Sequence, residues 1–171
     1  FSFFGLQALL VYYMTKHLGF SQAQSSLIYG SYRAAAFFSP FLGGIVADRW
    51  LGRTRAVVLG GVLMMLGHFT MASEALLLPG LVLVAIGNGL FLPPLAIQVG
   101  ALYADNDPRK AYAFSAYYMG INLGAVLAPL VCGTLGELYG WHWGFPAAGV
   151  GMAVGLVIFL VLTTWKRGRA L

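Results

Sequence analysis

Charged residues are scarce in this chain. Asp, Glu, Lys and Arg together make up 9% of its 171 residues, whereas 60% of the residues are hydrophobic and 15% are aromatic. A soluble protein of this size covers roughly a third of its surface with charged side chains, and five acids with ten bases cannot supply that cover. The composition therefore excludes an ordinary soluble domain and predicts an all-α integral membrane protein whose surface faces lipid.

Cysteine is nearly absent as well, and so are the residue patterns of common catalytic sites. Cys132 is the only cysteine, which excludes an internal disulfide, and it lies in an apolar run where we expect a small core residue. No two of the three histidines have the spacing of metal ligands, no HExxH sequence occurs, and no Ser/His/Asp set falls at one depth. We therefore expect neither a metal site nor an enzymatic activity.

Apolar segments account for most of the chain, and about 20 apolar residues are enough to cross a membrane as a helix. By this measure we predict six spans, at residues 1–17, 22–47, 56–73, 75–103, 111–137 and 143–165. The first span begins without a polar flank, so we expect helix 1 to be truncated at its start. It also lacks the basic region and the cleavage site of a signal peptide.

Basic residues mark the ends of these spans and give the chain a formal net charge of +5. Because they do not gather on one face, we expect no nucleic-acid partner. They occupy alternate ends of the predicted bundle: Arg49, Arg53 and Arg55, then Arg109 and Lys110, then Lys166, Arg167 and Arg169. The opposite ends carry only Lys16, so the positive-inside rule places the arginine-rich ends in the cytoplasm.

A short pattern of proline, glycine and acid occurs twice. Near the end of span 2 the chain reads Ser39-Pro40-x-x-Gly43-Gly44-x-x-Ala47-Asp48, and near the end of span 5 it reads Ala128-Pro129-x-x-Cys132-Gly133-x-x-Gly136-Glu137. The charge count puts the two copies on opposite sides of the membrane. Two inverted three-helix repeats, which are typical of secondary transporters, explain this arrangement. A chance similarity between glycine-rich helix ends is the alternative.

Four segments resemble motifs of one transporter family. The loop Gly44-x-x-x-Asp48-Arg49-x-x-Gly52-Arg53-x-Arg55 resembles the helix 2–3 motif of the major facilitator superfamily, with the additional residue before the glycine that is typical of proton-dependent oligopeptide transporters. Tyr117-Tyr118-Met119-Gly120-Ile121-Asn122-Leu123-Gly124 is similar to the FYxxINxG signature of that subfamily. Phe1-Ser2-Phe3-Phe4-Gly5 resembles the end of its ExxERFxYYG motif, and Gly87-Asn88-Gly89-Leu90-Phe91 leads into the segment that usually reads GxGxxKPN.

This resemblance covers the whole chain and implies both a fold and a function. Residues 1–171 would be the N-terminal six-helix bundle of a twelve-helix transporter, built from two inverted three-helix repeats as in that superfamily, with the C-terminal bundle absent from this chain. The implied function is proton-coupled uptake of di- and tripeptides by alternating access, driven by the proton gradient without a cofactor. The expected partners are small peptides, protons, membrane lipid and the C-terminal bundle, and the expected location is the bacterial inner membrane. The proton-coupling residues would precede Phe1.

The chain departs from the family pattern at several positions. The two tyrosines expected in the peptide site are Phe3 and Phe4, the helix-1 arginine is Gln7, and the helix-4 lysine is Leu92, followed by Pro93 and a second proline. The aromatic wall is kept, but two cationic anchors for a peptide carboxylate are lost. A major facilitator transporter of another solute, such as a drug, nitrate or sugar, is therefore the alternative function. A non-transporting membrane protein is a third.

Four further residues are candidates because they are polar or aromatic inside predicted spans. Arg33 costs at least about 2.5 kcal/mol at membrane depth unless it faces water or an anion; we expect it to bind the substrate carboxylate or an upstream glutamate, and snorkelling to the interface is the alternative. Asn122 can bond a peptide backbone, or alternatively a neighbouring helix. Phe37 is a pocket candidate, with simple packing as its alternative. His68 is expected to bond a neighbouring helix, with a proton relay as the alternative.

Glycine and proline predict which elements move. In spans 4 and 5 they weaken the backbone hydrogen-bond ladder, so we expect the inner gate to bend at Gly89, Pro93, Gly120 and Gly124. The helix 2–3 loop is expected to hold one conformation through Asp48, Arg49, Gly52 and Arg53.

Overall fold

The backbone is helical along almost its whole length. A computed structural model describes residues 1–169, and within them the side chains of residues 1–165. No strand occurs among these residues. The all-α fold class predicted from the composition is therefore confirmed.

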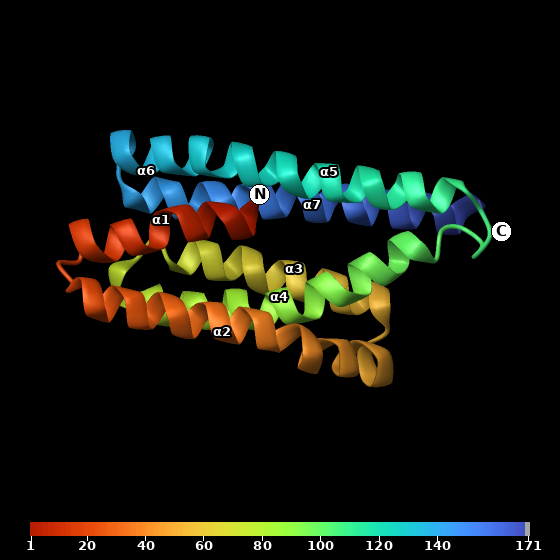
Figure 1. The fold of residues 1–171 in the computed structure, drawn as a ribbon, viewed down its shortest axis with the longest axis horizontal. Coiled ribbons are helices and arrows are strands. Elements are labelled where there is room, and N and C mark those ends of the chain that lie inside the picture. Colours follow the sequence, from red (N-terminus) through yellow and green to blue (C-terminus); the bar gives the residue numbers. More distant parts are fainter. Residues whose placement is uncertain (170–171) are drawn as a thin grey trace.

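Six helical rods lie side by side, as predicted (Figure 1). They are α1 (Ser2–Lys16); α2 (Gln22–Val46), continued by η1 (Ala47–Leu51); α3 (Arg53–Thr70); α4 (Leu77–Gly100), preceded by η2 (Glu74–Leu76); α5 (Arg109–Ala128), continued by η3 (Pro129–Gly133) and α6 (Thr134–Tyr139) as one rod; and α7 (Trp141–Arg169). The predicted ends of the rods differ from the observed ones by only a few residues. η1 and η3 are π-helical turns, and η3 begins at Pro129, whose missing N–H interrupts the ladder of the fifth rod.

Three of the rods are long and apolar enough to cross a membrane by length and composition alone. These are Glu74–Gly100, Arg109–Tyr139 and Trp141–Trp165. α1 has only 15 residues, and α2 and α3 carry arginine and other polar side chains among their apolar ones. The polar content of α2 matters below, because it includes Arg33.

Successive rods run in opposite directions, so their connections alternate between two ends of the bundle (Figure 1). One end holds the α2–α3 and α4–α5 connections with Arg49, Arg53, Arg55, Arg109 and Lys110. The other end holds the α1–α2 and α3–α4 connections beside Lys16. This is the alternation that the charge count predicts. The side chains of Lys166, Arg167 and Arg169 lie outside the described residues.

The two copies of the repeated pattern lie toward opposite ends of the bundle. α2 and α5 run in opposite directions (Figure 1), and each carries the proline of its copy close to its last turns: Pro40 inside α2 and Pro129 directly after α5. Opposite placement is what an inverted repeat requires.

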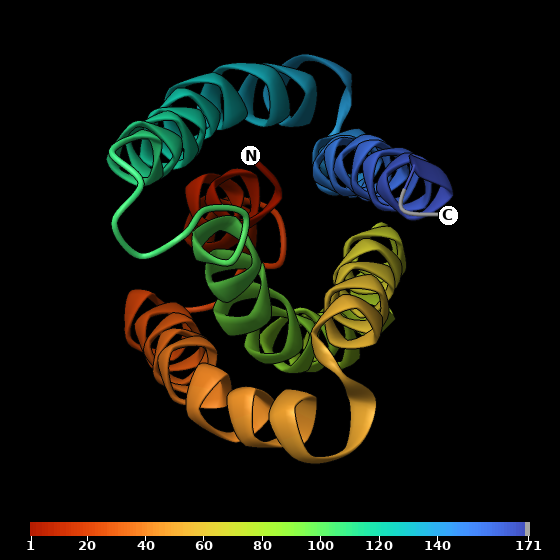
Figure 2. The ribbon, with the colours of Figure 1, turned by 90° about the vertical axis from the view of Figure 1, so that its right-hand side faces the viewer.

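α4 packs between α2 and α3, while α1 packs against α5 and α7 (Figure 2). The contact between α3 and α4 is made by glycine backbones. A Cβ on Gly87 would lie 2.6 Å from the carbonyl oxygen of Gly60, and a Cβ on Gly80 would lie 2.8 Å from that of Gly67. Small residues that let helix backbones touch are a common means of helix association in membranes.

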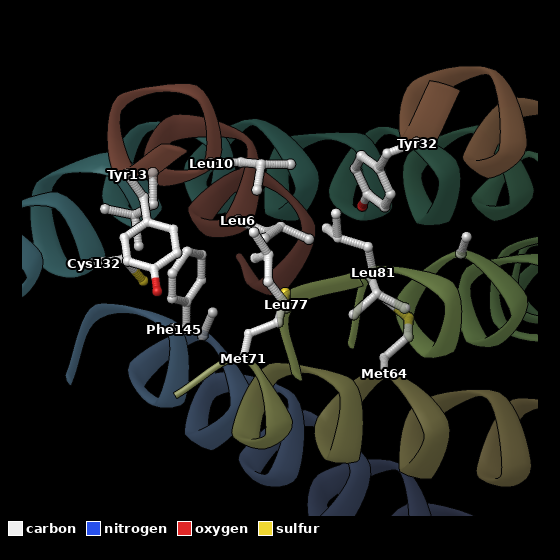
Figure 3. Close-up of a cluster of buried hydrophobic side chains, with 14 of the residues drawn as sticks. Leu6, Leu10, Tyr13, Tyr32, Met64, Met71, Leu77, Leu81, Cys132 and Phe145 are labelled. Atoms are coloured by element: carbon white, nitrogen blue, oxygen red, sulfur yellow. The ribbon is translucent and has the colours of Figure 1, made fainter. Parts of the chain in front are cut away.

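An apolar core fills the space where α1 meets α3 and α7. Leu6 and Leu10 of α1 are fully buried and belong to one cluster with Met71 and Phe145 (Figure 3). Cys132 is a free thiol buried in the same cluster, which confirms its predicted role as a small core residue. One face of α1 is therefore packed in this core. A different face of the same helix is left to contribute to the candidate site.

Candidate functional site

Arg33 lies in the middle of α2. It comes eleven residues after the helix begins at Gln22, which is about 16 Å along the axis at 1.5 Å per residue. Its part-buried guanidinium donates from Nη1 to Oε1 of Gln7 on α1, over 2.6 Å. The guanidinium is therefore held by a neighbouring helix halfway along α2, and its place in the substrate site stays a prediction.

Two aromatic rings flank this guanidinium on the same face of α2. Cζ of Arg33 lies 4.9 Å from the ring centroid of Phe37 and 5.9 Å from that of Tyr29. The three residues are spaced four apart, so they stand above one another on the helix. The ring of Phe37 therefore covers a cation and is itself 69% exposed, and its place in a substrate pocket stays a prediction.

Donors outnumber acceptors in this cluster. The guanidinium has five N–H donors and no acceptor, and no carboxylate of the described residues forms an ion pair with Arg33. The acids of the chain all lie in or beside the connections: Asp48, Glu74, Asp105, Asp107 and Glu137. The amide nitrogen of Gln7 is also buried and unpaired in the part of the chain that is described. The arrangement therefore suits an anionic group that accepts hydrogen bonds.

The aromatic lining continues onto α1. Phe3 and Phe4 lie one turn before Gln7 and are both half-buried. Their rings meet edge to face with centroids 5.8 Å apart, and Phe3 also lies 6.4 Å from the ring of Tyr32 on α2. The predicted pair of phenylalanines therefore belongs to the same α1–α2 seam as Arg33.

Asn122 and Leu92 lie apart from this seam. Asn122 is exposed on α5 and forms no interhelical hydrogen bond within residues 1–165. Leu92 is 39% exposed on α4. No hydrogen bond or ring contact of the described side chains joins either residue to the cluster around Arg33. Their roles in substrate binding stay predictions.

His68 forms the interhelical bond that was predicted for it. Its Nε2 is hydrogen-bonded to Oγ of Ser2, and both residues are buried, which ties α3 to the start of α1. The other ring nitrogen, Nδ1, has no partner among the described residues. A proton relay through His68 stays a prediction.

The helix 2–3 loop holds one ion pair. Oδ1 of Asp48 lies 3.6 Å from Nε of Arg53, and both side chains are about half exposed. Gly52 between them has a φ of +75°, a left-handed conformation that favours glycine. Arg49 is exposed and forms no ion pair within the described chain. That this loop holds one conformational state stays a prediction.

The predicted gate positions differ in their surroundings. A Cβ on Gly124 would lie 2.6 Å from the backbone nitrogen of Phe1, whereas a Cβ on Gly120 would have no atom within 4 Å. Gly89 packs against the backbone of α2. α4 stays helical through Pro93, and its last turns swing away toward α5 (Figure 1). That the inner gate bends at these positions stays a prediction.

At the α4–α5 connection, the carboxylate of Asp107 binds the first residue of α5. Its Oδ1 accepts from the backbone nitrogen of Arg109 over 2.9 Å, and its Oδ2 accepts from Nη2 of the same arginine over 2.7 Å. The side-chain bond from Arg109, with the backbone bond, lowers the pKa of Asp107 below its ordinary value.

Sequence reasoning missed the pairing of Gln7 with Arg33, the ring of Tyr29, and Asn88 of α4, which donates from Nδ2 to the carbonyl oxygen of Ala36 over 2.9 Å. The spacing of Tyr29, Arg33 and Phe37 could have indicated the shared face. Nothing in the sequence indicates which residue of α1 lies opposite it.

An apolar helical bundle that holds a cation and aromatic rings at mid-depth is the architecture of a membrane transport protein. The sequence profile of the POT family matches residues 54–170. The chain belongs to the POT family.

Its relatives include the peptide transporter YePEPT of Yersinia enterocolitica, 41% identical over 93% of this chain and 33% of that protein, and the di-/tripeptide transporter of Lactococcus lactis, 37% identical over 93% and 34%. A crystal structure of a peptide transporter POT variant in complex with sulfate matches with a TM-score of 0.90 and 42% identity, over 94% of this chain and 34% of that one. This likeness confirms the N-terminal half of a major facilitator fold. The chain spans about a third of the length of the curated relatives that it matches.

Proposed function

We propose that the full-length protein takes up di- and tripeptides together with protons, by alternating access, and that this bundle is its N-terminal half. Membership of the POT family and relatives named as peptide transporters support this proposal. The observation that carries it is the donor-rich cluster of Arg33 and Gln7 at mid-depth. A peptide that crosses a membrane brings a carboxylate, and this cluster has the unused donors to receive one.

In this proposal Arg33 replaces the missing cationic anchors. One of its N–H groups bonds Gln7, and the remaining donors can hold a carboxylate in the forked geometry that guanidinium groups favour. The buried amide nitrogen of Gln7 would add one more donor. Phe3, Phe4 and Phe37 would form apolar walls for peptide side chains, which vary between substrates.

Two further binding positions complete the proposed site. Asn122 would bond the peptide backbone from α5, since its amide both donates and accepts. Leu92 would line the pocket as an apolar residue. The pairing of Arg33 with a glutamate upstream of Phe1 is the alternative role of this arginine, and the two roles predict different responses to loss of the substrate carboxylate.

The proton gradient would drive transport without a cofactor, through coupling residues upstream of Phe1 and with His68 as a second candidate. The C-terminal six-helix bundle of the same protein would close the other side of the cavity. Lipid would surround the apolar faces of a multi-pass protein, with its arginine-rich end in the cytoplasm of a bacterial cell and its rods in the inner membrane.

Uptake by liposomes containing the purified full-length protein tests the proposal. An inward pH gradient should drive accumulation of a labelled dipeptide, and a protonophore should abolish accumulation but leave slow equilibration. Arg33→Ala should reduce uptake, whereas Lys16→Ala, which removes an exposed charge at the end of α1, should leave it unchanged. Uptake that is independent of the gradient, or equal in Arg33→Ala and the parent protein, would contradict the proposal.

A major facilitator transporter of another solute, such as a drug, nitrate or sugar, is the second candidate. The absence of cations at Gln7 and Leu92, where peptide transporters usually carry them, favours it. Competition of dipeptide uptake by excess nitrate, a sugar or a free amino acid separates the two candidates. If one of these solutes is accumulated and dipeptides are not, the second candidate is correct.

A further inference from the structure

Pro40 removes the helical hydrogen bond of one carbonyl inside α2. Proline has no backbone N–H, so the carbonyl four residues earlier, that of Ala36, loses its helical donor. Ala36 is 3% exposed, and no water is available at membrane depth to replace the bond. The carbonyl therefore needs a donor from elsewhere in the protein.

Asn88 of α4 supplies that donor. Its Nδ2 donates to the carbonyl oxygen of Ala36 over 2.9 Å, and Asn88 is itself 3% exposed. Oγ of Ser39 adds a longer bond of 3.3 Å to the same oxygen. The bond lost to Pro40 is thus replaced by a bond between two helices.

Glycines bring the two backbones close enough for the short side chain of Asn88 to reach. A Cβ on Gly89 would lie 2.5 Å from the carbonyl oxygen of Ser39, and a Cβ on Gly43 would overlap the backbone of Gly89. α2 and α4 therefore touch at the position where Pro40 interrupts the ladder, and Asn88 lies in that contact.

The freed carbonyl belongs to the same stretch of α2 as two residues of the candidate site. Ala36 is three residues after Arg33 and directly before Phe37, so the course of α2 at Ala36 fixes where these two side chains stand relative to α1. The distance from Nη1 of Arg33 to Gln7 is only 2.6 Å. A change in the bend of α2 would therefore shift the base of the Arg33 side chain relative to Gln7.

We propose that Asn88 is a positioning residue for the substrate site. It caps the carbonyl that Pro40 frees and thereby fixes the bend of α2 that holds Arg33 and Phe37 in place. Asn88 touches no substrate in this role and acts through α2. Its transport readout rests on the proposed function, whereas the link between Asn88 and Pro40 does not.

A double-mutant cycle in the full-length protein tests the link. Asn88→Leu removes the donor while keeping a branched side chain with the same number of non-hydrogen atoms, and Pro40→Ala returns an N–H to the carbonyl of Ala36. Asn88→Leu should lower the melting temperature of the purified protein by several degrees when Pro40 is present, and by less than half as much in the Pro40→Ala background. Pro146→Ala, at the proline inside α7, is the matched control and should give no rescue.

The transport readout separates positioning from general stability. Asn88→Leu should raise the KM for a dipeptide about three- to tenfold and change the maximal rate less than twofold, and Pro40→Ala should restore the KM. The proposal would be overturned if Asn88→Leu had the same effect on the melting temperature and on KM with Pro40 as with Pro40→Ala. Equal rescue by Pro146→Ala would also overturn it. If Asn88→Leu alone does not fold, a folded double variant supports the proposal and an unfolded one overturns it. Since melting needs no substrate, absence of peptide uptake would refute the proposed function while leaving this test intact.

Discussion

Replacing Arg33 by alanine should weaken binding of a dipeptide far more than binding of the same dipeptide as its C-terminal amide. The guanidinium is the one described cation at mid-depth that has no carboxylate partner among residues 1–165, and its bond to Gln7 uses only one of its five N–H groups. If a substrate carboxylate takes two of the others, the alanine variant loses both bonds. The amide has no charge to lose.

The size of the effect follows from these bonds. Hydrogen bonds to charged groups contribute about 1.5–3 kcal/mol each, so the loss of two at the lower value costs about 3 kcal/mol, or roughly 100-fold in affinity. Water in an open cavity screens part of this energy, so we expect about 10- to 100-fold for the dipeptide and less than about fivefold for the amide. Arg33→Lys should fall between these limits, because it keeps the charge but loses the fork.

Inhibition of labelled dipeptide uptake by the two unlabelled compounds measures both affinities in proteoliposomes. Lys16→Ala is the control, since it removes an exposed charge at the end of α1 and should change neither affinity. If Arg33→Ala weakened the binding of the dipeptide and of its amide by the same factor, the reasoning would be refuted. That result would instead favour an ion pair between Arg33 and a glutamate upstream of Phe1.

Three further predictions follow from the packing and the charges. Gly87→Ala should destabilise the bundle by about 1–3 kcal/mol, because the added carbon would lie 2.6 Å from a carbonyl oxygen of α3. Gly120→Ala, which adds a carbon in open space, should leave the melting temperature unchanged or raise it. Equal shifts of the melting temperature in the two variants would contradict this packing. Asp48→Asn should lower the free energy of unfolding by less than about 1 kcal/mol, since the ion pair of Asp48 with Arg53 spans 3.6 Å at the surface. It should nevertheless change the alkylation rate of cysteines placed at the two ends of the cavity. An unchanged rate would show that the loop has no part in gating. Asp107→Asn should speed hydrogen exchange in the first turn of α5 at pH 7. The carboxylate contributes stability above its unfolded pKa of 3.8 and loses this contribution only as the pH falls through its lowered folded pKa. The same exchange rate in both proteins would show that the carboxylate does not stabilise this turn.

Much of the fold could be predicted from the sequence, because the membrane imposes a length on each apolar segment and places arginine at its ends. The six rods and their alternating directions follow from these two rules. Gly52 and the arginines around it mark where α2 gives way to α3. The motifs that resemble the POT family were sufficient to identify it, since each is recognised from a short stretch of local sequence.

The candidate site could be predicted only in part. Arg33 was singled out by the cost of placing a cation at membrane depth, and His68 by the need of a buried ring for a partner; both arguments concern one residue and its solvent. The partners were not predictable. Gln7 was read as the loss of an anchor, and only the structure reveals that it accepts a bond from Arg33.

Transfer energies act on each segment separately, so six lipid-facing helices with one arginine deep inside the second could be predicted from the amino acids alone. How α1, α2 and α4 are rotated against one another became known only from the folded bundle. That rotation depends on side-chain packing between distant segments, and it determines that Gln7 meets Arg33, that Asn88 reaches the carbonyl freed by Pro40, and that donors remain unused where a substrate could accept them.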